Sequence, residues 1–548
     1  MKRLQNQGKA AAIAVAIGVL TLSAGAAAED RPVVSARAGQ RPPRPMPAAS
    51  AEGIRLSLDQ AIGLALANNR DLDVTVNAAE ASRYTLFGNQ GIFDPVLTAD
   101  FTRGHAEQPA SSLLVGAPVS TQDTSIWGAQ VTQLAPTGGT FSLSWTGNRT
   151  ATNSTFYFIN PSYSAGLGLS LNQPLLRSFG SNATTWQIRI SRNTRDTAYQ
   201  TFVRSVQATV NGVEQAYWDL ASAIQNLDVK KESLRIAKDL NRITKIKIDV
   251  GSLAPIEIYQ TEFGIATAEE DIITADRLIG DAQDRLKRLL NVDSAKWVVP
   301  IVPTDPVQVP EVAINLEEGT RTALARRPEI LAQAYVTDSD RIQYEYWSNQ
   351  VLPGLNLVGR YGNIGLAGTV YDSAGNITST EGYGDAFGQV LDSKYKNWSI
   401  GLNFSYPILN RSARGARGAA RYTWEANKAL LTTTEQNVFV EVRAAARAID
   451  SSRRQISAAS KGRELAEKNL DAEKKKFDNG MSTTFQVNQI QRDLSDARTK
   501  ELLALAIYRK ALAAYHFFVA DILDWKKIQV EGVPEAAPPP TETRGDVR

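Results

Sequence analysis

The stretch Asn397–Tyr406, which reads N-W-S-I-G-L-N-F-S-Y, is the strongest indication of the fold. Its large side chains, Trp398, Ile400, Leu402 and Phe404, alternate with Asn, Ser and Gly, the period-two pattern of a strand with two unlike faces. About ten residues are what a tilted strand needs to cross a bilayer. The small polar face suits a water-filled lumen better than a charged exterior. We therefore favour a transmembrane barrel over a soluble sandwich with one wet face.

Five more stretches are expected to be strands of the same kind. Tyr163–Asn172 alternates as regularly as the first stretch, and the others alternate less regularly: Pro95–Arg103, Trp127–Gln133, Thr140–Thr146 and Gly354–Tyr361. Single-chain barrels start at about eight strands. The expected strands are too few to enclose a lumen alone, so several copies of the chain must contribute strands to one barrel.

The composition argues against most enzyme chemistry. Among 548 residues there is no cysteine and only two histidines, His105 and His516, which excludes disulfides, thiolate sites and histidine metal clusters. No phosphate-binding loop or dinucleotide fingerprint stands between a strand and a helix, and there is no serine elbow. The 60 basic and 57 acidic residues nearly balance, so nothing indicates a nucleic-acid partner. We expect no enzyme activity and no cofactor.

The two ends of the chain indicate export. Residues 1–28 combine a basic start, the apolar stretch Ala10–Leu22 and the small residues Ala26–Ala28, as a secretory signal peptide does; an N-terminal anchor helix is the alternative. No later stretch approaches the roughly eighteen uninterrupted apolar residues of a membrane helix, so a membrane would be crossed by strands. Residues 29–53 are expected to be a Pro/Arg-rich flexible leader and residues 531–548 a disordered tail.

Between these ends the sequence contains an internal repeat. Residues 56–67 align with residues 314–325, and Leu167–Pro174 aligns with Ile400–Pro407. Landmarks that recur in one order are typical of duplicated architecture. We therefore expect three segments: a first repeat at 54–300 with barrel strands at about 95–173, a linker at 301–312, and a second repeat at 313–530 with barrel strands at about 353–406.

Each half also contains a very long helical run, Phe179–Val250 in the first and Ser412–Phe477 in the second. Globular helices rarely exceed about 25 residues, so these runs are expected to be coiled coils. Apolar residues from Val203 to Leu227 support this, since they follow alternating steps of three and four. Gly251 and Gly480 stand where the helices should reverse, which predicts a helical hairpin tip in each half. A soluble coiled-coil rod would show the same seam.

The chain resembles the TolC family of outer-membrane efflux and secretion channels over nearly all of residues 54–530. Three features carry the resemblance: Leu56-x-Leu58-x-x-Ala61-x-x-x-Ala65-Leu66 with its second copy, Leu171-x-Gln173-Pro174-Leu175-Leu176, and the two glycine-centred tips. The family implies an α+β membrane protein. A trimeric transmembrane β-barrel, with four strands from each subunit, would continue into a long coiled-coil α-helical periplasmic barrel, all built from two internal repeats.

The resemblance also implies a location and partners. The chain would be a homotrimer in the lipid of the cell outer membrane, extending into the periplasm. It would be a passive channel for efflux of small molecules or for type I protein secretion, driven by an inner-membrane pump through a periplasmic adaptor (membrane fusion) protein. The alternative is a structural or adhesive surface protein with a coiled-coil rod and no transport role. Adaptor contact is expected at the tips, through Val250, Gly251, Ser252, Leu253, Asn479, Gly480, Met481 and Ser482.

The family further implies a pore constriction near the tips, here at Glu257, Phe477, Gln486 and Gln489. Its best-known members carry aspartates where this chain has Gln486 and Gln489, and an arginine where it has Ser482. Carboxylates on a symmetry axis attract cations, and glutamines do not. We therefore expect a mouth with weak cation selectivity and no tie between an arginine and an acidic residue.

An extra hairpin is the second departure from the family. It would run from Trp127 to Thr146 and turn at Ala135–Gly139, whereas the family needs only two strands in the first half. The extra pair would either protrude from the surface or enlarge the barrel, and we favour protrusion.

Overall fold

The structure is a computed structural model that describes residues 46–47, 53–110, 116–307, 309 and 313–530. The expected signal peptide (1–28) and tail (531–548) lie outside the described residues, as do most of the leader (29–53) and part of the linker (301–312). The chain divides into two compact units. The helical unit comprises Met1–Glu80, Tyr199–Leu331 and Thr434–Arg548, and the sheet unit comprises Ala81–Ala198 and Ala332–Thr433. Each unit draws on both halves of the sequence.

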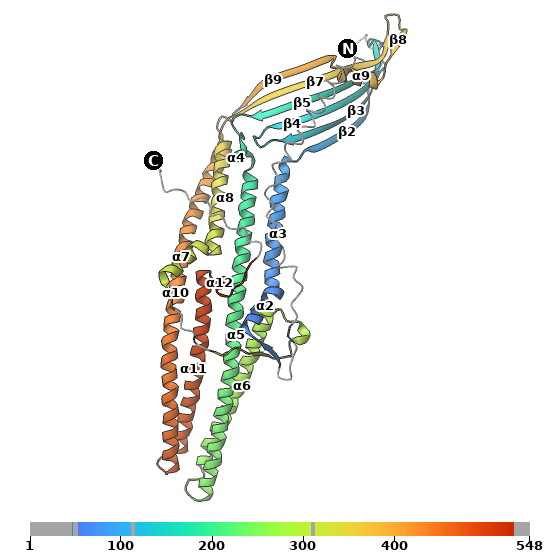
Figure 1. Ribbon diagram of the computed structural model, residues 1–548. Helices are drawn as coiled ribbons and strands as arrows, with labels where there is room; N and C mark the ends of the chain where they lie inside the picture. The colour runs from blue at the N-terminus through green and yellow to red at the C-terminus, as the bar shows by residue number, and fades with distance from the viewer. Residues whose placement is uncertain (1–45, 48–52, 111–115, 308, 310–312, 531–548) are drawn as a thin grey trace. The chain divides into compact units, whose positions relative to one another are not determined.

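The sheet unit contains a seven-stranded sheet (Figure 1). Its strands are β2 (Val96–Pro109), β3 (Val119–Leu134), β4 (Thr140–Thr152), β5 (Ile159–Pro174), β7 (Gly354–Tyr371), β8 (Ile377–Thr380) and β9 (Tyr395–Ser405). They lie in the order β2-β3-β4-β5-β7, and β8 and β9 pair with different stretches of β7. Every neighbouring pair is antiparallel.

The register aligns one row of apolar side chains across six strands on one face of the sheet. Leu97 of β2 pairs with Val131 of β3, and the same row continues through Leu143, Leu169, Tyr361 and Trp398. The neighbouring row, on the opposite face because side chains alternate, is Thr98, Gln130, Ser144, Gly168, Gly362 and Asn397. At this level the sheet therefore has one apolar face and one face of small or polar residues, and farther along β7 the second face also carries Ile364 and Leu366.

The expectation that the Trp127–Thr146 hairpin protrudes is wrong. β3 and β4 are inner strands of the sheet, because β3 pairs with β2 and β4 while β4 pairs with β3 and β5. Their alternation matches that of the neighbours, so the hairpin pairs with a strand on each side and continues both faces of the sheet. The turn lies at Ala135–Gly139 as expected, closed by a hydrogen bond from the Ala135 N–H to the Gly139 carbonyl (2.7 Å), with Gly138 at a φ of 84°.

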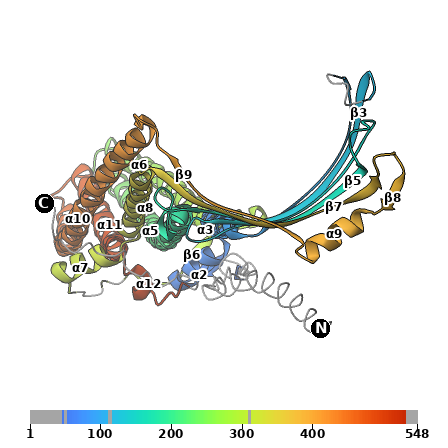
Figure 2. The same cartoon turned by 90° about the horizontal axis from the view of Figure 1, so that it is seen from above.

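A short helix that the sequence did not indicate, α9 (Tyr383–Leu391), covers part of the apolar face. Its Ala386 and Val390 pack against Ala165 of β5 and Ala367 of β7. Figure 2 shows the sheet curved, with α9 on the convex side. Ala165 shares its face with Leu167 and Leu169, so the apolar face is the convex one.

Two of the helices, α5 and α10, are far longer than the helices of ordinary globular proteins. Besides α9, the α-helices of the described residues are α2 (Leu58–Asn68), α3 (Arg70–Gln90), α4 (Ser181–Thr184), α5 (Trp186–Asp249), α6 (Glu257–Leu290), α7 (Leu316–Arg326), α8 (Pro328–Gln350), α10 (Arg411–Asp478), α11 (Thr484–Val519) and α12 (Ile522–Trp525). Short 3-10 helices lie at Gly91–Phe93 and Ser294–Lys296, and β1 (Ile54–Leu56) pairs in parallel with β6 (Ile301–Pro303). α5 has 64 residues and α10 has 68.

The core of the helical unit forms along the seam expected in α5. Val210, Val213, Tyr217 and Leu220 of this helix are fully buried and belong to one apolar cluster. α11 carries a window of 18 residues that is apolar enough to cross a membrane, but sixteen of the 36 residues of the helix, including Leu512, are buried in the structure. We therefore read α11 as a core helix.

Candidate functional site

The candidate site is the pair of helix reversals in the helical unit, which we call the first tip (250–254) and the second tip (479–483). At the first tip α5 ends in the left-handed residue Gly251, with a φ of 77°, and the Ser252 N–H donates to the Lys247 carbonyl at 2.8 Å. This geometry satisfies carbonyls that a helix end leaves free. Val250 is 70% exposed at the reversal.

The second tip has the same geometry. Gly480 has a φ of 75°, and the Met481 N–H donates to the Lys476 carbonyl at 2.8 Å. α11 then begins at a cap, because the Thr483 hydroxyl accepts from the Gln486 N–H at 3.2 Å. Met481 is 72% exposed. Each tip thus presents a large apolar side chain on a reversal that only a glycine allows without strain.

The structure brings the two tips together through contacts that sequence reasoning missed. The Lys247 ammonium donates to the Phe477 carbonyl at 2.6 Å and lies 4.1 Å from the centre of the Phe477 ring. The Thr484 hydroxyl donates to the Glu257 carboxylate. Thr484 is fully buried, and Glu257 is half-buried. These pairs are more than 200 positions apart in the sequence, and no local pattern could have indicated them.

The four residues expected at a constriction lie in different environments. Phe477 is only 3% exposed and packs against Leu240 and Val487, so its ring fills the space between helices. Glu257 contacts Thr484 as described. Gln486 is exposed, and Gln489 is half-buried between Arg492 and Asp493, accepting from the first at 2.7 Å and donating to the second at 2.9 Å.

Ser482, at the position of the family's arginine, makes a contact inside its own tip. Its hydroxyl donates to the Glu473 carboxylate at 2.6 Å, and the Lys476 ammonium lies 3.1 Å from the other oxygen of that carboxylate. The hydroxyl and then the ammonium hold the pKa of Glu473 below its usual value. Ser482 therefore connects the second tip to α10 through Glu473, which lies nine positions earlier in the chain.

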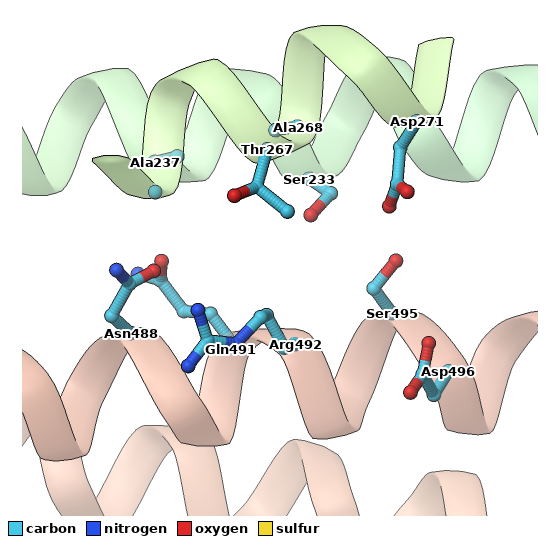
Figure 3. A pocket seen from close by; sticks show the side chains of 11 residues that line it. Ser233, Ala237, Thr267, Ala268, Asp271, Asn488, Gln491, Arg492, Ser495 and Asp496 are labelled. Carbon is cyan, nitrogen blue, oxygen red and sulfur yellow. The ribbon is translucent and has the colours of Figure 1, made fainter. Parts of the chain in front are cut away.

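A small polar cavity lies between α5 and α6 on one side and α11 on the other (Figure 3). Ser233, Thr267 and Asp271 line one side, with Gln491 and Ser495 on the other. Gln491 is 6% exposed, and its amide has no hydrogen-bond partner among the described residues. Buried polar groups of this kind are commonly satisfied by water.

Comparisons with known proteins agree on one architecture. The sequence model of the family described as outer membrane efflux protein matches residues 61–292 and 320–515. None of the curated proteins matches the chain.

Solved structures are similar over most of their length. The Campylobacter jejuni CmeC outer membrane channel has 17% identity and a TM-score of 0.62, covering 85% of this chain and 86% of that one. The outer membrane protein VceC of Vibrio cholerae has 13% identity and a TM-score of 0.61, covering 84% and 95%. The open Neisseria gonorrhoeae MtrE channel has 17% identity and a TM-score of 0.55, covering 85% and 89%. At these identities the likeness concerns the fold.

Proposed function

The chain belongs to the outer membrane efflux protein family, and we therefore propose that three copies assemble into a passive channel that an inner-membrane pump drives through a periplasmic adaptor. The family match confirms the resemblance to the TolC family and the location in the outer membrane, with an extension into the periplasm. The chain is thus an outer-membrane efflux channel. The homotrimer, the closed barrel, the adaptor and the pump are our proposal.

The observation that carries the proposal is the convex apolar face of the sheet. Phe101, Leu402 and Trp398 on this face are 72%, 68% and 74% exposed. Soluble monomers rarely expose a continuous apolar surface of this extent. Lipid would cover it, and the opposite face of small polar residues would line water.

The exposed apolar residues of the tips support the adaptor part of the proposal. Val250, Ile256 and Met481 are 70%, 69% and 72% exposed, and they stand at or next to helix reversals. Such side chains are suited to insert between the helices of a partner. We place the adaptor contact at residues 250–254 and 479–483.

Small-molecule efflux is our first choice of transport, and type I protein secretion is the second. Both need the same channel, and the cargo would be selected by the pump. The rival from another class is an adhesive surface protein, whose barrel would serve only as an anchor.

Conductance separates a channel from an anchor. The purified protein, reconstituted in planar lipid bilayers, should give discrete ion-conducting steps. An anchor that is plugged would give none, and a chain that stayed soluble without detergent and left vesicles intact would overturn the proposal.

Crosslinking in cells tests the tips. A photo-crosslinking residue at Val250 or Met481 should capture a periplasmic adaptor, and the same residue at Tyr422, which is 74% exposed on α10, serves as the control. Val250→Asp and Met481→Asp should abolish export and leave trimers intact. Loss of trimers would instead make the tips assembly elements.

A further inference from the structure

Within the described residues, each copy of the chain has six strands of bilayer-spanning length, rather than the four that the family resemblance implies. β2, β3, β4, β5, β7 and β9 have 14, 16, 13, 16, 18 and 11 residues. A tilted strand needs about 9–11 residues to cross a bilayer, so each is long enough. The two strands beyond those that the family resemblance implies are β3 and β4.

β3 and β4 carry the same two-faced pattern, at the same level, as the strands beside them. Val131 and Leu143 stand in one row between Leu97 and Leu169 on the apolar face. On the other face Gln130 and Ser144 stand in the neighbouring row. A hairpin that protruded into water would have no reason to keep this register with both neighbours.

The two edges of the sheet are complementary. Within the described residues β2 and β9 each pair on one side only, which leaves a row of backbone donors and acceptors at each edge. An even number of alternating strands makes these edge strands run in opposite directions. β9 of one copy and β2 of the next would therefore pair antiparallel, as all neighbours in the sheet already do.

The edge of β7 beyond β9 is already occupied. Just beyond the first residue of β9, the side-chain amide of Gln389 on α9 accepts from the Leu366 N–H at 3.1 Å and donates to the Leu366 carbonyl at 3.0 Å. These two hydrogen bonds occupy the backbone N–H and carbonyl of Leu366, and farther along β7 pairs with β8, which has only four residues. Of the described strands, β9 is therefore the one of bilayer-spanning length with a free edge on this side of the sheet.

We propose that the transmembrane wall takes six strands from each copy and closes by pairing β9 of one copy with β2 of the next. The inference rests on the proposed assembly of copies into a barrel. With three copies, the wall has three times six, or eighteen, strands. Barrel diameter grows roughly linearly with strand number, so this outlet would be about one and a half times as wide as a twelve-stranded one. Barrels of this strand number enclose an aqueous channel.

The absence of cysteine from the sequence allows a direct test. Single variants Val131→Cys and Leu143→Cys place a thiol on the outer face of β3 and β4, and Gln130→Cys and Ser144→Cys place one on the lumen face of the same strands. Leu169→Cys and Leu402→Cys are the controls on β5 and β9, which belong to the wall under either arrangement.

In intact outer membranes, a water-soluble maleimide should label Gln130→Cys and Ser144→Cys at least about tenfold faster than Val131→Cys and Leu143→Cys, because lipid suppresses the reactive thiolate. Fast labelling of Val131→Cys and Leu143→Cys, with Leu169→Cys and Leu402→Cys still protected, would overturn the six-strand wall and leave the channel intact. Fast labelling of the four apolar-face variants, Val131→Cys, Leu143→Cys, Leu169→Cys and Leu402→Cys, would overturn the barrel itself.

Disulfide trapping tests closure between copies. Thr98→Cys on β2 is combined in turn with Asn397→Cys, Ser399→Cys and Asn403→Cys on β9, all on the polar face. At least one pair should give covalently linked copies on oxidation, and each single variant is its control. If no pair links copies, closure by β9 and β2 is wrong.

Discussion

The ammonium of Lys247 lies 2.6 Å from the carbonyl oxygen of Phe477 and 4.1 Å from the centre of its ring. The Lys247 ammonium thus donates a hydrogen bond to a carbonyl in the last turn of α10 and makes a cation–π contact with the ring of the same residue, Phe477. The first tip is tied to the second by this contact and by the bond from Thr484 to Glu257. We propose that these contacts hold the tips in place of the arginine-to-acid pair that the family resemblance implies and this sequence lacks.

Lys247→Met should loosen the tips. Methionine keeps the contact with the Phe477 ring but removes the charged donor, and a hydrogen bond to a charged group contributes about 1.5–3 kcal/mol. We expect a larger mean conductance in planar bilayers and a greater share of long openings. Lys245→Met, an exposed lysine two positions away, should leave conductance unchanged. If Lys247→Met conducts as the native channel does, the contact does not hold the tips.

Acid should loosen the second tip. The pKa of Glu473 is held below its usual value of 4.5, first by the Ser482 hydroxyl and then by Lys476. A carboxyl whose pKa is lower in the folded state contributes stability above its unfolded pKa and loses it as the pH falls through the folded one. Amide exchange at residues 479–483, corrected for its intrinsic pH dependence, should therefore lose protection below pH 4.5.

Ser482→Ala distinguishes this contact from a general effect of acid. The variant should show weaker protection of residues 479–483 at neutral pH and a smaller loss on acidification, because part of the pKa difference is gone. Ser252→Ala in the first tip is the matched control and should behave as the native chain. Equal pH profiles for the native chain and Ser482→Ala would assign the acid effect to other groups.

Tyr217→Phe should destabilise the helical unit. The buried Tyr217 hydroxyl donates to the Asp305 carboxylate at 2.5 Å and accepts from the Thr304 N–H at 3.1 Å, which joins α5 to the segment that follows β6. Burial raises the pKa of this hydroxyl, so it stays protonated and remains a donor. Its loss leaves a carboxylate without that donor and should cost about 1–3 kcal/mol.

Thermal unfolding followed by circular dichroism measures the effect of Tyr217→Phe. Tyr422→Phe is the control, since Tyr422 is 74% exposed. An unchanged melting temperature for Tyr217→Phe would show that water replaces the hydroxyl without loss.

Local patterns were sufficient to predict the long strands and helices, but not their partners. Alternation in Asn397–Tyr406 and the glycines at 251 and 480 predicted a strand and two helix reversals, because each depends on neighbours in sequence. The place of β3 and β4 depends on register with strands on both sides, which no single stretch encodes. The contact of Lys247 with Phe477 is equally non-local, and α9 is too short to be distinguished by periodicity.

The mouth of the channel should be insensitive to divalent cations. Gln486 is exposed and Gln489 half-buried near the second tip, where the family's best-known members carry aspartates. Three copies would place these amides around the axis, and neutral amides do not concentrate cations as carboxylates do. Millimolar divalent cations should leave the conductance of the native channel within about twofold of its starting value.

The double variant Gln486→Asp/Gln489→Asp should create a cation site at that mouth. Carboxylates gathered on an axis raise one another's pKa, so block by divalent cations should strengthen as the pH rises and more of them ionise. Gln486→Asn/Gln489→Asn keeps the amides and should stay unblocked. Single-channel recordings across a series of divalent concentrations make the comparison. Strong block of the native channel would place other acidic groups at the constriction, and an unblocked aspartate variant would remove residues 486 and 489 from the pore.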